Sequence, residues 1–288
     1  MNTLKTGFLM ILLSSFLVMA GYFMGGMGGM IFALIISLAM NFFTYWFSDK
    51  LALRMTGARE VSQEDAPDLH FIVEEQARLA QLPKPRVYVI ESASPNAFAT
   101  GRNPKHAAVA ATTGIMRILS RDELSGVLAH EMAHVGNRDT LIMTVAAALA
   151  GAITFLAMMA RFSALFGGMG GGDGDRRGGN HGAVVGMIGL LVVAILLPLA
   201  AFLVRTAISR SREYHADATG AQTSRHPLAL ASALEKLELE SHRKPMKVNE
   251  AVSHLFIVNP LSGLSASMFS THPPIQKRIA RLREMRIV

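Results

Sequence analysis

The sequence predicts a mainly helical α+β protein that is anchored in a membrane by about four transmembrane helices. Three observations support this fold class. Hydrophobic residues make up 51% of the 288 residues and charged residues only 17%. The mean hydropathy of +0.33 is high for a soluble globular protein. The longest uncharged stretches occur in two pairs, and the second pair is expected to divide the soluble domain in two.

The first pair of uncharged stretches begins after Lys5 and ends before Asp49. It is too long for a single span of about 20 residues, and the glycines between residues 25 and 29 divide it. A cleaved signal peptide with Lys5 in its basic region is the alternative, but a second apolar run follows at once. We therefore expect a transmembrane hairpin over residues 1–48, with helices at about 6–25 and 29–48.

The second pair is predicted as a hydrophobic hairpin over residues 140–204. Its helices are expected at about 141–162 and 183–204, joined by a glycine-rich loop at 166–182 whose composition is typical of a flexible connection. A buried core helix or a hairpin that lies in the membrane interface is the alternative. The soluble domain would then consist of residues 49–139 and 205–288.

The distribution of positive charge orients the chain in the membrane. The net charge is +7, and the basic residues that flank the expected spans all lie on one side. The positive-inside rule places this side, with both termini and both soluble segments, in the cytoplasm. The basic residues that carry this prediction are Lys5, Lys50, Arg54, Arg59, Arg138, Arg205, Arg210 and Arg212.

The soluble segments show an α+β pattern. Helical periodicity predicts a helix over 67–82, and two short apolar runs at 86–90 and 106–112 predict strands. Ser120 and Glu123 match a capping box, so a helix is expected to begin near Arg121. It could continue into the third span, because only Gly136 and Asn137 interrupt the helical pattern. A last helix is expected over 274–286.

The predicted helix after Ser120 carries the motif His130-Glu131-Met132-Ala133-His134. Two histidines four residues apart lie on one helix face and can hold one zinc ion, and the glutamate between them can act as a general base on a water molecule. The chain has no cysteine, so the remaining zinc ligands must be His, Glu or Asp. The alternative is an ordinary solvated helix face.

A third ligand is expected downstream. A metzincin site would place a histidine six residues after His134, where this chain has Thr140. A carboxylate is the remaining option, and Glu213 directly follows the second hairpin. Asp217 lies on the same helix face and could accept a hydrogen bond from a ligating histidine. Spacing alone leaves open that both acids pair with arginines at the surface. His215 would point about 200° away from Glu213 and is expected to be structural.

The combination of HEMAH, a hydrophobic hairpin and SRSREYHAD (209–217) resembles the M48 family of membrane zinc metallopeptidases. Within it, the HtpX type is more similar than the larger CAAX prenyl endopeptidases. Two further segments fit the resemblance, Pro95–Gly101 as the family's NAFA segment and Thr271–Pro274 as its HP motif. The resemblance implies a gluzincin-like domain with one Zn²⁺ per chain on His130, His134 and Glu213, and with Glu131 as the catalytic base.

The resemblance also implies a biological role. It predicts a multi-pass protein of the cell inner membrane that degrades misfolded or damaged membrane proteins at its cytosolic side, as part of quality control in the stress response. The alternatives are a selective processing peptidase of the same family and a non-catalytic membrane scaffold with a structural zinc. The intact Glu131 argues against the scaffold, because a structural site does not need a base.

Two further residues are candidates for contact with a substrate. His272 could donate a hydrogen bond to the oxyanion, or could instead cap the last helix. Asn96 could bind substrate backbone, or could instead serve the turn after Pro95. The strand at 106–112 is expected to be an edge strand that binds an extended peptide.

The expected partners are unfolded polypeptides or membrane proteins, and the lipid bilayer. The basic residues lie at the span ends and no nucleic-acid motif occurs, so anionic lipid is the expected partner of that charge. The sequence does not decide whether the chain forms a homo-oligomer.

Overall fold

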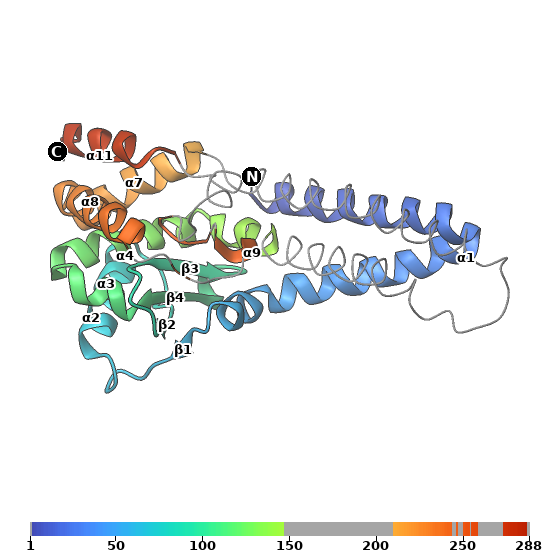
Figure 1. Ribbon diagram of the computed structural model, residues 1–288, viewed down its shortest axis with the longest axis horizontal. Helices are drawn as coiled ribbons and strands as arrows, with labels where there is room; N and C mark the ends of the chain where they lie inside the picture. The colour runs from blue at the N-terminus through green and yellow to red at the C-terminus, as the bar shows by residue number, and fades with distance from the viewer. Residues whose placement is uncertain are drawn as a thin grey trace, which may run out of the picture.

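The computed structural model describes residues 2–146, 210–243, 246, 250–253, 255–258 and 273–286. It shows a mainly helical protein with one small sheet, as the composition predicts (Figure 1). The expected spans at 141–162 and 183–204, with the loop at 166–182, lie outside the described residues apart from 141–146. Of the four predicted spans, one helix in the described chain, Gly26–Met55, is long and apolar enough to cross a membrane.

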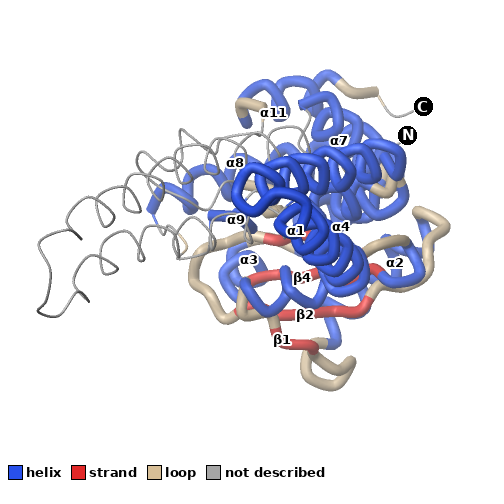
Figure 2. The backbone as a smooth tube through the Cα atoms, turned by 90° about the vertical axis from the view of Figure 1, so that its right-hand side faces the viewer, coloured by secondary structure: helices blue, strands red, loops and turns tan. Residues whose placement is uncertain are grey.

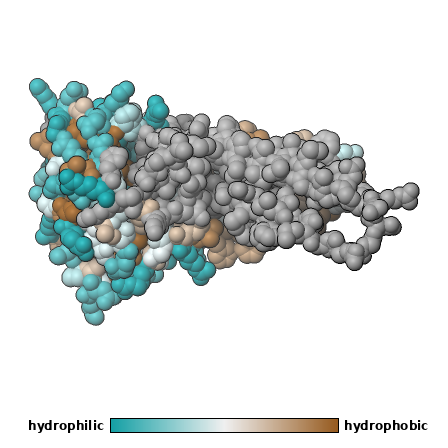
Figure 3. Space-filling model, viewed as in Figure 1, coloured by the Kyte–Doolittle hydropathy of each residue, from teal (hydrophilic) through white to brown (hydrophobic). Residues whose placement is uncertain are grey.

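Helix α1 (Asn2–Met55) folds back on itself at Gly26, which has a φ of 58°. Its two arms run antiparallel away from the globular end (Figure 1). The arms approach closely at Gly21 and Gly29, and Asn41 Nδ2 donates to Ser14 Oγ at 2.7 Å. The visible side chains of α1 are mostly hydrophobic, whereas polar side chains cover the globular end (Figure 3). The second arm extends beyond the expected residue 48.

The sheet has four strands in the order β1-β2-β4-β3. Strand β2 pairs in parallel with β4, and β3 pairs with β4 in the antiparallel direction. The predicted strand at 86–90 is confirmed, whereas the prediction that 106–112 forms an edge strand is wrong. Both sides of β4 are already paired, so the edge belongs to β3, which the NAFA segment forms. The strands are β1 (Arg59–Glu60), β2 (Arg86–Ile90), β3 (Ala97–Gly101) and β4 (Ala107–Thr112).

Both faces of the sheet are covered, which explains why β2, β3 and β4 are mostly apolar, whereas the two residues of β1 are exposed. On one face Val89, Val109 and their neighbours belong to one hydrophobic core with residues of helices α2 (Pro67–Leu79), α4 (Arg121–Gly136), α8 (Pro227–Arg243) and α11 (Ile275–Glu284). On the other face Ile90, Phe98 and Ala110 pack against the end of α1, residues 141–146 and the segment around Phe256. The globular end is therefore built directly on the second arm of α1.

Helix α4 begins as predicted, because Ser120 and Glu123 form the complete capping box. It ends at Gly136, and Arg138 then adopts a left-handed backbone conformation with φ of 57°. A new helical segment starts at Asp139. The expectation that α4 continues into a third span is therefore wrong, because the chain turns between His134 and Leu141. The remaining helices are η1 (Pro104–His106), α3 (Thr113–Ile118), α7 (Arg210–Ser224) and α9 (Glu250–Ser253).

Helix α4 lies beside the edge strand β3, and α7 lies beyond α4 (Figures 1 and 2). Gly220 permits the close packing of α7 on α4. A Cβ atom at this position would lie 2.7 Å from the amide nitrogen of His130 and 2.8 Å from its Cα. Two distant segments of the sequence therefore meet backbone to backbone at His130.

Replacing Gly220 with alanine should separate α7 from α4, since backbone cannot move as a flexible side chain does. We expect a loss of about 1–3 kcal/mol of stability, measured as a lower Tm of the full-length protein in detergent. The matched variant is Gly136→Ala in α4, where the added Cβ would meet only the Leu82 side chain at 3.6 Å and should not lower the Tm. Equal melting temperatures of the two variants would contradict the close approach.

Candidate metal centre

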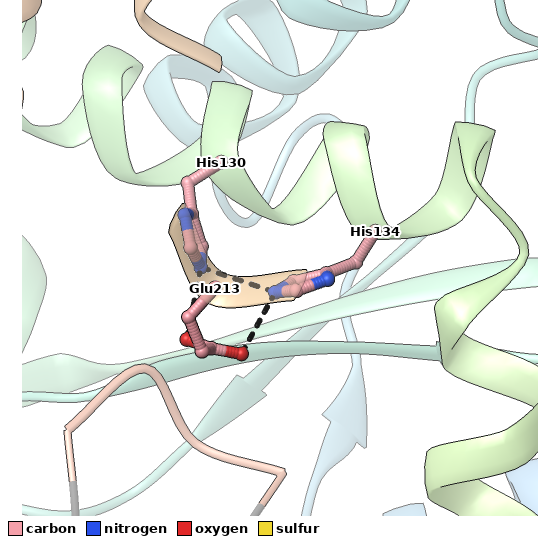
Figure 4. Close-up of side chains that lie close together, drawn as sticks. All are labelled: His130, His134 and Glu213. Atoms are coloured by element: carbon pink, nitrogen blue, oxygen red, sulfur yellow. Dashed lines mark hydrogen bonds and ion pairs between the residues drawn. The ribbon is translucent and has the colours of Figure 1, made fainter. Parts of the chain in front are cut away.

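Helices α4 and α7 bring His130, His134 and Glu213 together, with their side chains pointing toward one another (Figure 4). The two Nε2 atoms lie 3.2 Å apart. Glu213 Oε1 lies 3.4 Å from His134 Nε2, and Glu213 Oε2 lies 3.8 Å from His130 Nε2. All three side chains are buried. Residues separated by the whole second apolar region of the sequence thus converge on one point.

The spacing of these atoms fits a zinc ion. Ligand atoms at about 2.0–2.1 Å from a tetrahedral zinc lie about 3.4 Å from one another. Two imidazole nitrogens that face each other at 3.2 Å must also share a proton or a metal ion, because their lone pairs would otherwise repel. Burial opposes a proton on His134, but hydrogen bonds with Asp139 and Glu213 outweigh this and raise the pKa of His134 to about 10. The site therefore favours a cation, and a metal ion would satisfy both rings and Glu213 together.

The other ring nitrogen of each histidine faces a carboxylate. His130 Nδ1 lies 3.0 Å from Asp217 Oδ1, as the sequence analysis proposed for Asp217. His134 Nδ1 lies 3.2 Å from Asp139 Oδ2. When a carboxylate accepts the proton of Nδ1, Nε2 presents its lone pair to a metal and the ring is held in orientation. Burial also lowers the pKa of His130, which favours the neutral ring that binds metal.

Arg278 on α11 completes the set of charged groups. It is fully buried, and it donates to Asp217 through Nε at 2.8 Å and through Nη2 at 2.7 Å. Its Nη1 donates to the Ile257 carbonyl at 3.1 Å and lies 3.5 Å from Glu213 Oε2. Although burial opposes ionisation, the guanidinium lowers the pKa of Asp217 to about 2. Glu213 and Asp217 are thus buried charges, and the alternative of surface pairing is not observed.

The charge balance of the described site also matches a divalent cation. Four buried carboxylates surround the two histidines, and two arginines act on them, Arg278 directly and Arg212 through its charge. With both histidines neutral and all four carboxylates ionised, as metal binding requires, two negative charges remain, and buried charge is costly unless it is compensated. A divalent ion would neutralise them. The carboxylates are those of Glu131, Asp139, Glu213 and Asp217.

Glu131 occupies the side of α4 that faces the edge strand. Its Oε2 accepts a hydrogen bond from the Ala99 amide of β3 at 2.8 Å. Burial raises the pKa of Glu131 to about 8. The carboxylate therefore lies close to both the histidine pair and the edge strand β3, a position that suits a group that moves a proton beside an extended peptide.

Asn96 is fully buried, and the structure gives it a different contact from the one expected. Its Nδ2 donates to the Val258 carbonyl at 2.7 Å, and its Oδ1 accepts from the Val258 amide at 3.3 Å. Asn96 thereby holds the segment that follows α9 against β3. His272 lies outside the described residues. His215 is exposed on α7, away from the cluster, as its helical spacing predicts.

Asp139 and Arg278 were not found from the sequence. Asp139 lies beyond the turn that ends α4, and a helix continuing through Asn137 would have directed it elsewhere. Arg278 had a usable signal, because it lies between Ile275 and Leu282 on the apolar face of α11. A lone charge on such a face is rare unless it is paired in the core.

The fold and the site fit a metallopeptidase, with two histidines and one glutamate placed where they could hold a metal ion. Comparisons with known proteins agree. The family model "Peptidase family M48" matches residues 63–286, and the chain belongs to this family. It is a metalloprotease of the membrane.

Curated relatives described as "Protease HtpX homolog" match nearly the whole chain. The relative from Syntrophotalea carbinolica is 55% identical over 100% of both chains, and that from Pyrococcus furiosus is 54% identical over 98% of this chain and 95% of the relative. The crystal structure of S. mikatae Ste24p is similar in fold, with a TM-score of 0.54 at 18% identity. The match covers 98% of this chain and 64% of Ste24p.

Substituting Asp139 with asparagine should weaken metal binding, because His134 would lose the charged acceptor that orients its ring. We expect the affinity for Zn²⁺, measured by competition with a chelator, to fall by about 10-fold to 100-fold. The control is Asp122→Asn, an exposed acid in the first turn of the same helix, which should bind zinc like the wild type. Unchanged affinity in the Asp139 variant would show that Asp139 does not support the site.

Proposed function

We propose that this metalloprotease is a zinc endopeptidase that degrades misfolded or damaged membrane proteins at the cytoplasmic side of the cell inner membrane. The observation that carries the proposal is the position of the site. The His130, His134 and Glu213 cluster lies in a domain whose core begins on the apolar helix arm Gly26–Met55. Substrates would therefore be cleaved close to the membrane surface. Family membership leaves the alternative of a non-catalytic scaffold without support.

The roles of the residues follow from the geometry. His130, His134 and Glu213 would hold one Zn²⁺, with Asp217 and Asp139 fixing the two rings. When bound, the ion polarises the scissile carbonyl and makes water acidic enough to lose a proton near neutral pH. Glu131 would accept that proton on its carboxylate and pass it to the leaving amine. His272 remains the proposed donor to the oxyanion.

The edge of β3 is the proposed binding place for the substrate backbone. Its outward-facing groups are engaged within the chain. The Ala97 carbonyl accepts from the Ile257 amide at 3.0 Å, the Ala99 amide donates to Glu131, and the Gly101 carbonyl accepts from Thr140 Oγ1 at 2.9 Å. A peptide that pairs with β3 must replace these contacts. When the segment at Val258 moves away, the Asn96 amide would become available to bind the substrate backbone. We therefore infer that the structure shows a closed form of the site.

Replacing Glu131 with glutamine should retain zinc but stop proteolysis, since the amide cannot accept the proton of water. We expect the cleavage rate of an unfolded membrane protein to fall by at least about 10²-fold, with wild-type zinc content. The control is Glu74→Gln, a glutamate with 62% of its side chain exposed. The folded form of the same substrate should be cleaved slowly. Equal cleavage by the Glu131 variant would contradict the mechanism, and equal cleavage of both substrate forms would contradict the role in quality control.

The proposed orientation can be tested because the chain has no cysteine. An Arg117→Cys variant places one thiol at an exposed position of the globular domain, and Met27→Cys places one at the hairpin turn of α1. A membrane-impermeant maleimide should label Met27→Cys in intact spheroplasts and Arg117→Cys only in inverted vesicles. Labelling of Arg117→Cys from outside the cell would place the catalytic domain on the opposite side.

A further inference from the structure

A cavity of about 680 Å³ opens where the second arm of α1 meets the sheet. One wall is aromatic and comes from α1, with Phe42, Trp46 and Phe47. A neighbouring wall is basic and comes from the connection between β3 and β4, with Arg102 and Lys105. The volume is that of a typical small-molecule site. The cavity is separate from the proposed metal centre and shares no residue with it.

The aromatic wall has the properties of a membrane interface. Phe42 is 57% exposed, and Trp46 and Phe47 are each 43% exposed. All three belong to the arm that is apolar enough to cross a membrane and lie near the end that enters the globular domain. Tryptophan and other aromatic residues gather at the level of the lipid headgroups. The cavity therefore lies at headgroup depth if this arm spans the bilayer.

The lining of the cavity carries positive charge that the described part of the chain does not fully neutralise. Five basic residues and one acid, Asp49, line the cavity. Arg86 pairs with Asp49 at 3.2 Å, and Lys84 pairs with Glu74 at 2.6 Å. Among the residues that the structure describes, the other three form no ion pair with a carboxylate. These are Lys50, Arg102 and Lys105.

Arg102 is positioned by the aromatic wall. Its guanidinium carbon lies 4.6 Å from the centre of the Trp46 ring, and Lys50 Nζ lies 5.5 Å from the centre of the Phe47 ring. A guanidinium that stacks on a ring keeps its N–H groups free at the edge, and this edge matches the geometry of phosphate oxygens. The stacking therefore holds a phosphate-binding group in place beside an apolar surface.

We propose that this cavity binds the phosphate headgroup of an anionic phospholipid, with the acyl chains lying along the Phe42 and Phe47 side of α1. The unpaired cations of the basic wall match the anionic phosphate. The exposed aromatic wall favours a lipid over a soluble phosphate, because only the lipid also carries apolar chains for that surface to contact. Such a lipid would fix the depth of the globular domain at the cytoplasmic face of the bilayer.

The single tryptophan of the chain is Trp46, so tryptophan emission, excited at a wavelength that tyrosine does not absorb, reports on this cavity. The full-length protein is reconstituted into phosphatidylcholine nanodiscs that contain a minor fraction of brominated phosphatidylglycerol or an equal fraction of brominated phosphatidylcholine. Bound lipid should make quenching by the brominated anionic lipid several-fold stronger. Equal quenching by the two lipids would overturn the proposal.

The variant Arg102→Gln/Lys105→Gln should bring the ratio of the two quenching efficiencies close to one. The ratio is compared within each variant, so a change in the unquenched emission of Trp46 cancels. The control Arg78→Gln/Arg117→Gln removes the same charge from exposed positions of α2 and α3 and should keep the wild-type ratio. If the first variant does not fold, Lys105→Gln alone should give an intermediate ratio. An equal fall of the quenching ratio in the control variant would show that the anionic lipid is attracted non-specifically, and would overturn the proposal.

A last experiment distinguishes binding of a lipid from binding of a free phosphate ion. Inorganic phosphate is added to the wild-type protein in the same nanodiscs, against sodium chloride of equal ionic strength. We expect the preference for brominated phosphatidylglycerol to be the same in both salts. Loss of the preference in phosphate alone would show that the cavity takes the free ion, and would overturn the assignment to a lipid.

Discussion

The structure depends on the burial of four carboxylates where α7 packs on α4. Glu131 and Asp139 come from the region of the HExxH motif, and Glu213 and Asp217 come from α7. Each is nearly inaccessible to solvent, so their charges must be compensated within the protein. Arg278 compensates Asp217 and reaches Glu213, and the two histidines face oxygens of Asp139, Glu213 and Asp217. The folded protein therefore requires positive charge in this site to balance the buried carboxylates.

This requirement links the fold to the proposed chemistry. Gly220 lets the backbones approach, which sets Glu213 opposite the histidine pair. The Asp217 and Asp139 carboxylates orient the two rings, and α11 contributes Arg278 from the far end of the chain. Helix α4 also runs beside β3, so Glu131 reaches the strand edge. One helix thus carries two of the proposed metal ligands on one side and the proposed general base toward the proposed substrate strand.

The local parts of this arrangement could be predicted from the sequence, and the long-range parts could not. The capping box, the HExxH helix and the i, i+4 spacing of Glu213 and Asp217 are set by contacts within one helix. The edge position of β3 depends on which strand pairs on each side of β4. The sequence of a short apolar strand does not reveal its pairing partners. Arg278 is 148 residues from His130, so only the tertiary fold brings it to the site. The turn at Arg138 could not be predicted either, because a left-handed conformation at a residue other than glycine has no reliable sequence signal.

We infer that α4 and α7 together hold one zinc ion with an open coordination position. X-ray absorption at the zinc edge of the purified full-length protein tests this inference. We expect one zinc per chain, with two imidazole nitrogens at about 2.0–2.1 Å and oxygen ligands that include one protein carboxylate and exchangeable water. A protein without zinc, a shell without imidazole, or a closed shell of four protein ligands would contradict it.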